Sequence, residues 1–280
     1  MRLRAPAKIN LSFRILARRA DDFHEIETLM APISLHDEIT LTLTEIIGEI
    51  RLTCDDESLP NGDDNLAACA ARLFFDATNT KAGLAIALQK QIPHGAGLGG
   101  GSSDAAAVLL GLNELLQTGL AVDELVRLGA KIGSDVPFFL FRSTATCRGR
   151  GEIVEPAHLG QRLPLLLLKP RFSVPTPWAY SRWRDARELP GVDYRAQEFG
   201  GMTFVNDLER PVFEKYLFLA RMKTWLREQA EVGAAMLSGS GSTVFAVLRD
   251  GAGAEALAAR AKLELDPQLW TCACETMADG

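Results

Sequence analysis

The sequence lacks a hydrophobic run long enough to cross a membrane, and its cysteines are few and scattered. Among its 280 residues are five cysteines, of which only Cys272 and Cys274 lie close together. No apolar stretch approaches the roughly 20 residues of a membrane span, and residues 1–6 lack the apolar centre of a secretory signal. A zinc site would need further ligands near the cysteine pair. We therefore expect reduced, mostly buried thiols, no metal site built from cysteine, and a cytoplasmic protein.

Clusters of lysine and arginine are also absent. The chain has 30 basic and 36 acidic residues, which gives a formal net charge of -6. Nucleic-acid-binding proteins usually carry a basic face, so we expect no nucleic-acid partner, and no membrane partner either. Hydrophobic residues make up 47% and charged residues 24% of the chain, without repeats or low-complexity segments. This composition is typical of a folded chain with a substantial core.

The stretch from Pro93 to Ser103 is more depleted of side chains than any other window of the chain. It reads Pro-His-Gly-Ala-Gly-Leu-Gly-Gly-Gly-Ser-Ser. Alternating apolar residues at 84–92 predict a strand before it, and residues 104–110 predict the first turns of a helix after it. Glycine lets a ligand approach the main chain, and a helix N-terminus presents free N–H groups with partial positive charge. The pattern therefore predicts an anion site, most often one for phosphate.

Three other interpretations of this glycine loop, residues 93–103, are less favoured. The spacing of Gly95, Gly97 and Gly100 matches the dinucleotide fingerprint, but that fold needs a second strand ending in an acid about 20 residues later. Here the residues that follow predict two helices. A Walker A loop would carry a lysine before Ser102, and a flexible linker is not usually held between a strand and a helix. A phosphate cradle of backbone N–H groups remains, with Ser102 and Ser103 able to bind phosphate or a metal ion.

Hydrophobic patterning predicts further strands and helices along the whole chain. We expect strands at residues 7–15, 38–44, 49–53, 144–148, 152–154, 164–168, 235–238, 243–248 and 269–275, and helices at 65–78, 122–131, 206–216, 219–232 and 252–264. Asn65 is a predicted helix N-cap. Residues 186–203 are the least regular stretch. A second α+β unit is expected to begin near residues 157–163, which divides the chain into domains 1–160 and 161–280.

Two charged residues have ordinary structural interpretations from the pattern alone. Lys8 and Asn10 share one face of the strand at 7–15, about 7 Å apart, and a strand lysine usually extends into solvent. Asp135 directly precedes Val136 and Pro137, as a helix N-cap does.

Three further features also have ordinary structural interpretations from the pattern alone. His24 fits a lone surface histidine of a polar loop, and Tyr180 fits a core aromatic of a short helix. Residues 239–242, Gly-Ser-Gly-Ser, fit a tight hairpin turn.

Seven blocks of the sequence resemble one family. The glycine loop is similar to the ATP loop of the GHMP kinases, a superfamily that includes galactokinase, homoserine kinase and mevalonate kinase. Six further blocks resemble the branch that acts on a cytidine diphosphate-linked methylerythritol, and they follow the family's order. They are residues 5–11, 22–25, 133–139, 175–177, 206–209 and 238–241. The resemblance implies an α+β, two-domain GHMP-kinase-type fold with a ferredoxin-like C-terminal domain and the active site in the interdomain cleft.

The resemblance also implies an activity and its residues. The expected reaction is ATP-dependent phosphorylation, with Mg²⁺, of the 2-hydroxyl of that small-molecule substrate in the non-mevalonate (MEP) isoprenoid precursor pathway. Lys8 and Asp135 would be catalytic, with Asp135 taking the hydroxyl proton. The residues expected to bind ATP are Pro93, His94, Gly95, Ala96, Gly97, Leu98, Gly99, Gly100, Gly101, Ser102 and Ser103. Those expected to bind the substrate are Asn10, Phe23, His24, Thr176, Tyr180, Gly239 and Gly241. In the family His24 reads the cytosine edge and Tyr180 stacks on the base, a contact worth about 1–3 kcal/mol.

One block departs from the family's pattern. Where the family commonly has Gly-Tyr-His-Glu, this chain has Asp22, Phe23, His24 and Glu25. Phe23 keeps the ring but lacks the phenol hydroxyl, and Asp22 must adopt the backbone angle of the glycine. The departure concerns how the nucleotide end of the substrate is recognised.

A hypothesis of another class is a nucleotide-sensing or RNA-binding module that uses this fold without turnover. It would bind ATP or RNA and form no product. The acidic balance of the chain and the joint presence of Lys8 and Asp135 disfavour it.

Overall fold

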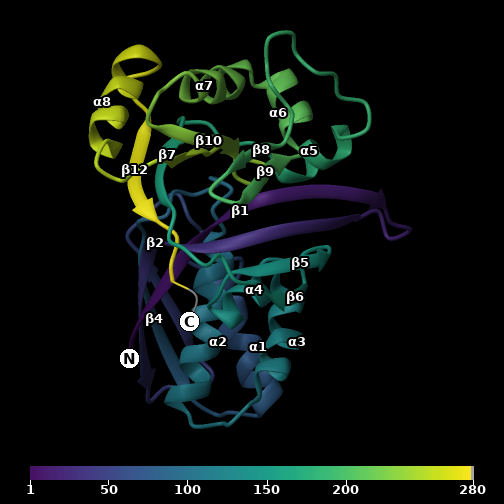
Figure 1. Ribbon diagram of the computed structural model, residues 1–280. Coiled ribbons are helices and arrows are strands. Elements are labelled where there is room, and N and C mark those ends of the chain that lie inside the picture. Colours follow the sequence, from purple (N-terminus) through teal and green to yellow (C-terminus); the bar gives the residue numbers. More distant parts are fainter. Residues whose placement is uncertain (279–280) are drawn as a thin grey trace.

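The structure is a computed structural model that describes residues 1–278, and these form two lobes connected by a long β-hairpin (Figure 1). The N-terminal lobe contains strands β1 (Arg2–Arg18), β2 (His24–Thr44), β3 (Ile50–Cys54), β4 (Gly83–Gln89), β5 (Ala145–Gly149) and β6 (Ile153–Pro156), and helices α1 (Leu66–Thr78), α2 (Gly100–Leu115), α3 (Val122–Ile132) and α4 (Val136–Phe141). The C-terminal lobe contains β7 (Pro164–Lys169), β10 (Val232–Leu237), β11 (Val244–Leu248) and β12 (Trp270–Glu275), and helices α5 (Thr176–Arg182), α6 (Glu209–Lys215), α7 (Leu217–Arg227) and α8 (Ala254–Glu264). Between them are β8 (Gln197–Phe199) and β9 (Met202–Asn206).

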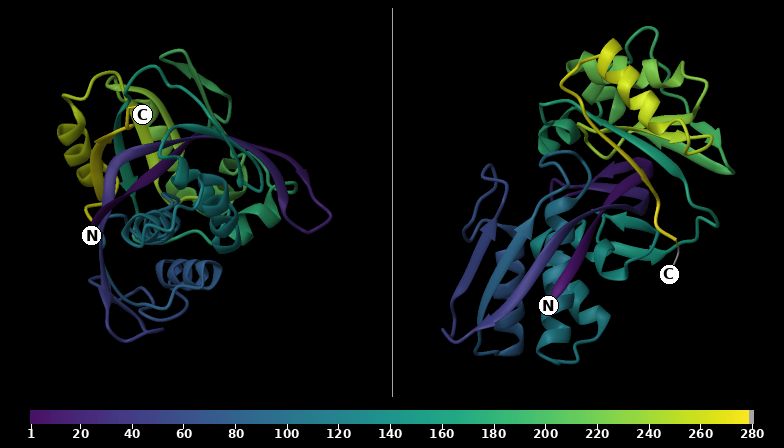
Figure 2. Two further views of the ribbon diagram at one scale, coloured as in Figure 1. Left: turned by 90° about the horizontal axis from the view of Figure 1, so that it is seen from below. Right: turned by 90° about the vertical axis from the view of Figure 1, so that its left-hand side faces the viewer.

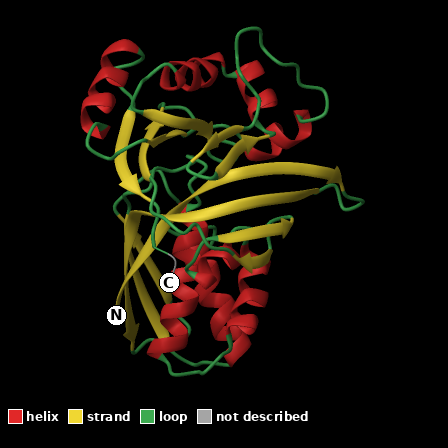
Figure 3. Ribbon diagram, viewed as in Figure 1, coloured by secondary structure: helices red, strands yellow, loops and turns green. Residues whose placement is uncertain are grey.

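The larger sheet forms the framework of the N-terminal lobe. Its described strands follow the order β3-β4-β2-β1-β9-β8, with β5 also paired to β2 and β6 paired to β5. Helices α1 to α4 pack on one side of this sheet, as Figure 3 shows. Small alanines of α2, among them Ala105 and Ala106, are buried at this contact and let the helix lie close to the strands.

The smaller sheet belongs to the C-terminal lobe and has the strand order β10-β11-β7-β12 among the described residues. With helices between β7 and β10 and between β11 and β12, this is the β-α-β-β-α-β arrangement of a ferredoxin-like fold. The α+β class and the ferredoxin-like C-terminal half are thereby confirmed. The other face of the sheet packs on the larger sheet through a buried cluster that includes Ile9, Leu11, Leu165, Leu167 and Phe245. The two lobes therefore share a core.

The β1–β2 hairpin sets the distance between the ends of the site. Lys8 pairs with Pro32, Asn10 with Met30 and, near the tip, Arg18 with His24. Strands rise about 3.3 Å per residue, so residues near the tip lie far from Lys8 along the strand. The hairpin extends beyond both lobes in Figure 1, with Phe23 in its turn.

Most of the expected elements are present, although several of their boundaries were wrong. Residues 24–37 continue β2, although only residues 38–44 were predicted as a strand. Residues 186–203, predicted to be the least regular stretch, contain only β8 and the start of β9. The helix predicted from residue 206 begins at Glu209, since Asn206 ends β9. Asn65 caps α1 as predicted, accepting a hydrogen bond from the Ala67 N–H.

The predicted division at residue 160 stays a prediction. β9 pairs in parallel with β1, with Ser12 opposite Val205, so a strand from the second half of the chain completes the larger sheet. Thr276, directly after β12, forms a bridge to Ile33 and so brings this segment back to the N-terminal lobe (Figure 2).

Two smaller expectations concern membranes and thiols. None of the helices within residues 1–278 has the length and apolar character needed to span a bilayer. All five cysteines are free, but only Cys147 is buried and the others are half-buried.

Candidate active site

The glycine loop joins β4 to α2 with its main chain exposed to a cavity of about 310 Å³. Gly95, Gly97 and Gly99 have positive φ angles of 62°, 76° and 71°, which favour glycine. A side-chain carbon at Gly97 would collide with the carbonyls of Ser238 and Gly241, and the latter oxygen would lie 2.9 Å away. The N–H groups of the first turn of α2 begin directly after Gly99. The loop therefore has the shape of a backbone cradle for an anion.

The two serines at the end of the loop face different surroundings. Ser102 lines the glycine-loop cavity with the residues from Pro93 to Gly101, whereas Ser103 does not. Ser103 is 1% exposed, and its Oγ has no hydrogen-bond partner among residues 1–278. Ser102 is thus the serine that a phosphate or metal ion in this cavity could reach.

The other wall of this cavity was not found from the sequence. The residues that line it come from the loop before α1 and from the start of that helix, and they are Leu59, Pro60, Asp64, Asn65 and Leu66. Three of these side chains are apolar, which suits contact with a planar base. The one sequence signal for this wall was Pro60, which lies in a segment rich in turn residues.

A buried charge cluster supports the base of the loop. Lys90 Nζ donates hydrogen bonds to Asp37 Oδ2 at 2.5 Å and to Asp104 Oδ2 at 2.6 Å. Asp37 Oδ1 accepts hydrogen bonds from the backbone N–H groups of Gln91 and Ile92, just before the loop. Burial raises the pKa of Asp104 to about 7, with Lys90 opposing and Asp37 adding to the rise. One lysine thus holds two carboxylates together where β4 ends and α2 begins.

A second cavity, of about 670 Å³, meets the first at Gly97 and Gly99, which line both. Lys8 lies on its wall, with Nζ 2.7 Å from Asn10 Oδ1 and 3.6 Å from Asp135 Oδ2. Asn10 is held in turn, because its amide donates to Thr28 Oγ1 at 2.8 Å. The structure therefore brings together Lys8 and Asp135, the two residues expected to be catalytic.

The interpretation of Lys8 as a solvated lysine was wrong, and Asp135 occupies the predicted N-cap position of α4 without a side-chain capping hydrogen bond. The Lys8 side chain is only 5% exposed, because the backbone at Gly99 and at Gly239 lies close to it. Asp135 precedes α4, but its side chain accepts no capping hydrogen bond and is directed to Lys8 instead. Its carboxylate is 36% exposed, which leaves it accessible from the second cavity.

The far end of the second cavity is aromatic. The His24 ring lies 5.2 Å from that of Tyr180 and 5.9 Å from that of Trp183. Burial lowers the pKa of His24, and the positive charges of Arg18 and Arg184 lower it further. The imidazole is therefore neutral at pH 7.

Residues of the C-terminal lobe line the same cavity. Thr176 and Ser240 share a hydrogen bond between their hydroxyl oxygens at 2.8 Å, and Gly239 lies beside Lys8 and Asn10. Of the residues expected to bind substrate, Gly241 alone is not on the cavity wall. Its carbonyl faces Gly97 instead, so it supports the glycine loop.

Comparison with known proteins places the chain in a family. The model described as "GHMP kinases N terminal domain" matches residues 65–143, and that described as "GHMP kinases C terminal" matches residues 195–265. The 4-diphosphocytidyl-2-C-methyl-D-erythritol kinase of Pelobacter propionicus is 39% identical, with 98% of both chains covered. The enzyme of the same name from Methylacidiphilum infernorum is 46% identical over 87% of this chain and 84% of the relative. The chain belongs to the 4-diphosphocytidyl-2-C-methyl-D-erythritol kinase family of the GHMP kinases.

Solved structures agree with membership of this kinase family. A crystal structure of 4-(cytidine 5'-diphospho)-2C-methyl-D-erythritol kinase aligns with a TM-score of 0.79 and 34% identity, covering 99% of this chain and all of that one. Homoserine kinase from Cytophaga hutchinsonii aligns with a TM-score of 0.74 at 17% identity, covering 100% and 95% of the two chains. The latter shows a shared fold only.

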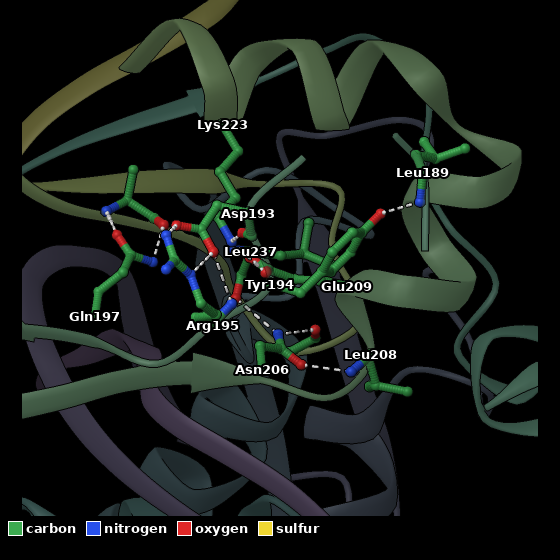
Figure 4. A network of polar contacts seen from close by, with 12 residues as sticks. Leu189, Asp193, Tyr194, Arg195, Gln197, Asn206, Leu208, Glu209, Lys223 and Leu237 are labelled. Atoms are coloured by element: carbon green, nitrogen blue, oxygen red, sulfur yellow. Dashed lines mark hydrogen bonds and ion pairs between the residues drawn. The ribbon is translucent and has the colours of Figure 1, made fainter. Parts of the chain in front are cut away.

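One sequence block that marks this kinase family serves the structure rather than the cavity wall. Asn206 Nδ2 donates to the carbonyls of Leu237 and Gly239, each at 2.8 Å, and Figure 4 shows Asn206 within this polar network. Glu209 Oε1 accepts from the Leu237 N–H at 3.0 Å, and Glu209 Oε2 accepts from Lys223 Nζ at 2.6 Å. This network fixes the end of β10 and hence the position of Gly239 beside Lys8.

Sequence reasoning missed several polar residues of the second cavity in this kinase. Arg18, Arg150, Arg184 and Ser240 line it. Arg150 stands alone between Gly149 and Gly151 in the β5–β6 turn. An arginine between two glycines was the one available signal.

Proposed function

We propose that this chain transfers the γ-phosphoryl group of ATP to the 2-hydroxyl of 4-diphosphocytidyl-2-C-methyl-D-erythritol, as a step of the non-mevalonate isoprenoid route. The full-length relatives carry the name of this kinase, which supports the substrate. In the chain itself, the proposal is carried by the position of Lys8 and Asp135 where the two cavities share Gly97 and Gly99. A nucleotide in the smaller cavity and an alcohol in the larger one would meet beside these side chains.

Three residues near the place where the two cavities meet have distinct tasks, and they are Asp135, Lys8 and Asn10. Asp135 is the general base that takes the proton from the substrate hydroxyl. Lys8 orients the Asp135 carboxylate and stabilises negative charge on the phosphoryl oxygens. Asn10 holds the Lys8 ammonium in place. Most of the acceleration comes from positioning and preorganised charge, because phosphoryl transfer needs little covalent help from the protein.

The glycine loop suits a nucleotide triphosphate. The N–H groups after Gly99 bind its phosphates, and Leu59, Pro60 and Leu66 contact its base. Mg²⁺ would neutralise negative charge on the phosphates, and Ser102 is the residue that would hold it. Residues 1–278 contain no cluster of three or more His, Cys, Asp or Glu that could hold a metal ion.

The aromatic end suits a cytosine. A neutral His24 has one nitrogen that donates and one that accepts, which matches the mixed donor and acceptor edge of this base. Tyr180 lies beside His24 and offers a ring for stacking. Burial and the nearby Asp135 raise the pKa of Tyr180, so its hydroxyl stays protonated.

A single-turnover experiment with γ-labelled ATP tests the proposal. We expect label to move to the cytidyl substrate when that substrate is present and no ATP consumption when it is absent. ATP binding without product would contradict the proposal and favour the nucleotide-sensing hypothesis. Preferential phosphorylation of homoserine or mevalonate would assign the chain a different substrate.

A further inference from the structure

Arg150 occupies a position in the second cavity to which no role has yet been assigned. It lies in the turn between β5 and β6, and this turn approaches both ends of the cavity. On one side, Gly149 pairs with Ile26 of β2, two residues from His24. On the other side, a side-chain carbon on Gly151 would lie 3.6 Å from the Ser134 carbonyl and 3.8 Å from Asp135 Oδ1. The turn therefore spans the gap between the aromatic end and the proposed base.

Contacts fix the guanidinium of Arg150 over this gap. Its central carbon lies 4.7 Å from the centre of the Phe23 ring, a cation–π arrangement. Its Nε lies 3.6 Å from Glu152 Oε1, and its backbone N–H donates to Glu152 Oε2 at 2.6 Å. The Arg150 side chain is 31% exposed and lines the cavity. It is thus oriented in advance but still free to bind an anion.

The other arginines of the cavity are less well placed for the same task. Arg18 is 59% exposed and paired with Asp22 at 2.8 Å, and Arg184 is exposed with its guanidinium 5.9 Å from the Trp183 ring. Arg18 lies opposite His24 in the hairpin register, and Arg184 lies by Trp183, which neighbours His24, so both charges are at the aromatic end. Of the three, Arg150 is the one whose neighbour in the chain, Gly151, lies beside Ser134 and Asp135.

We propose that Arg150 binds the diphosphate of the substrate and, with Phe23 as its platform, makes the site selective for a nucleoside diphosphate over a nucleoside. This rests on the proposed function, because it takes cytosine at His24 and the reacting alcohol at Asp135. The diphosphate joins those two parts of the substrate and must therefore lie between them. A guanidinium can bind two phosphate oxygens at once, which a lysine cannot do in the same geometry.

This assignment also gives Phe23 a function that does not need a hydroxyl group. The ring is 49% exposed on the hairpin tip, and the guanidinium of Arg150 covers one face. A phenylalanine supports a cation over its face as a tyrosine does. The absence of the family's usual phenol is thus compatible with substrate binding here.

Titration calorimetry with cytidine, CMP and CDP tests the role of Arg150. We expect wild-type protein to bind CDP at least about tenfold more tightly than cytidine. In Arg150→Met the affinity for CDP should fall about ten- to hundredfold, while that for cytidine changes less than about threefold. Arg150→Lys should fall between the two, because it keeps the charge but not the paired hydrogen bonds. If Arg150→Met does not fold, the ratio of CDP to cytidine affinity in Arg150→Lys decides instead.

The matched control is Arg148→Met, in β5, the strand directly before the turn that carries Arg150. Arg148 pairs with Glu27 and Glu155 and does not line the cavity, so its loss should leave the affinity ratio unchanged. Equal losses for cytidine and CDP in Arg150→Met, or no loss for either, would overturn the assignment of Arg150. Failure of the wild-type protein to bind any of the three ligands would instead overturn the proposed function.

Discussion

Lys8 Nζ lies 3.6 Å from Asp135 Oδ2 although the two residues come from distant parts of the chain. β1 supplies the lysine, and the segment before α4 supplies the carboxylate. The pair forms only when the larger sheet and the helices on it are assembled. Because the lysine is almost fully buried, its charge acts at short range on what lies next to Asp135.

Replacing either member of this pair should remove most of the proposed activity without unfolding the protein. We expect Lys8→Met and Asp135→Asn each to lower kcat by about 10²- to 10⁴-fold, since each removes a charge from the phosphoryl-transfer site. Lys81→Met, at an exposed position, is the control and should leave kcat unchanged. Steady-state kinetics on variants with near wild-type melting temperatures would check this. A wild-type kcat for either variant would exclude that residue from the mechanism.

A methyl group at Gly97 should weaken ATP binding through contact with the other lobe. Gly97→Ala must hold a φ of 76° and also displace the carbonyls of Ser238 and Gly241. Gly119→Ala has a φ of 69° but no atom within 4 Å of the new carbon, so it isolates the backbone effect. We expect both to lose about 1 kcal/mol or more of stability, and only Gly97→Ala to raise the KM for ATP. Equal KM values for the two variants would contradict the contact argument.

The stability of the Lys90 cluster should depend on pH through Asp104. The pKa of Asp104 is raised in the folded state from an ordinary 3.8 to about 7, because it is buried. Between these values the unfolded chain has released this proton while the folded chain retains it, so this group makes the protein less stable as pH rises across the window.

Asp104→Asn removes this titration. The stability of the variant relative to wild type should therefore increase from about pH 4 to about pH 7 and stay constant above that. Urea denaturation at several pH values gives the comparison, with Asp76→Asn on the exposed side of α1 as the control. A pH-independent difference would show that Asp104 ionises normally in the folded protein.

The buried Lys223–Glu209 pair should matter more for stability than for chemistry. Glu209→Gln leaves a buried ammonium with the Asp193 carbonyl as its remaining partner, a loss of about 3–5 kcal/mol in the free energy of unfolding. The double variant Glu209→Gln with Lys223→Met should recover part of it, because no unpaired charge remains. Thermal unfolding measures both, with Glu228→Gln at an exposed site as the control. Additive losses in the double variant would contradict the pairing.

The glycine loop was predictable from the sequence because its chemistry lies within one short segment. The strand before it, the helix after it and the exposed backbone all follow from neighbouring residues. By contrast, β2 was predicted only from residue 38 onward. Pro32 within it cannot donate a ladder hydrogen bond and argues against a strand. The structure accommodates Pro32 opposite Lys8, beside an irregularity in the register of the hairpin.

The surroundings of the site residues could not be predicted from local patterns. Alternation in β1 indicated a solvated Lys8, because nothing in those residues shows that the glycine loop and Gly239 lie against its side chain. Asp135 has the sequence context of a helix N-cap, and only the proximity of its carboxylate to Lys8 indicates a role in the site. Arg150 and Leu59 reach their cavities through long-range packing. The family resemblance located Lys8 and Asp135, but it gave no signal for Arg150.

The contact between the glycine loop and the C-terminal lobe also bears on when the nucleotide cavity is completed during synthesis. Ser238 Oγ donates to the Gly97 carbonyl at 2.9 Å, and the Thr243 N–H donates to the Ala96 carbonyl at 3.1 Å. Both donors are translated long after the loop that they hold. A nascent chain that ends before β10 has the strand and helix around the loop but no support on this side. Nucleotide affinity should therefore arise late in translation, once the ribosome has released the β10–β11 turn.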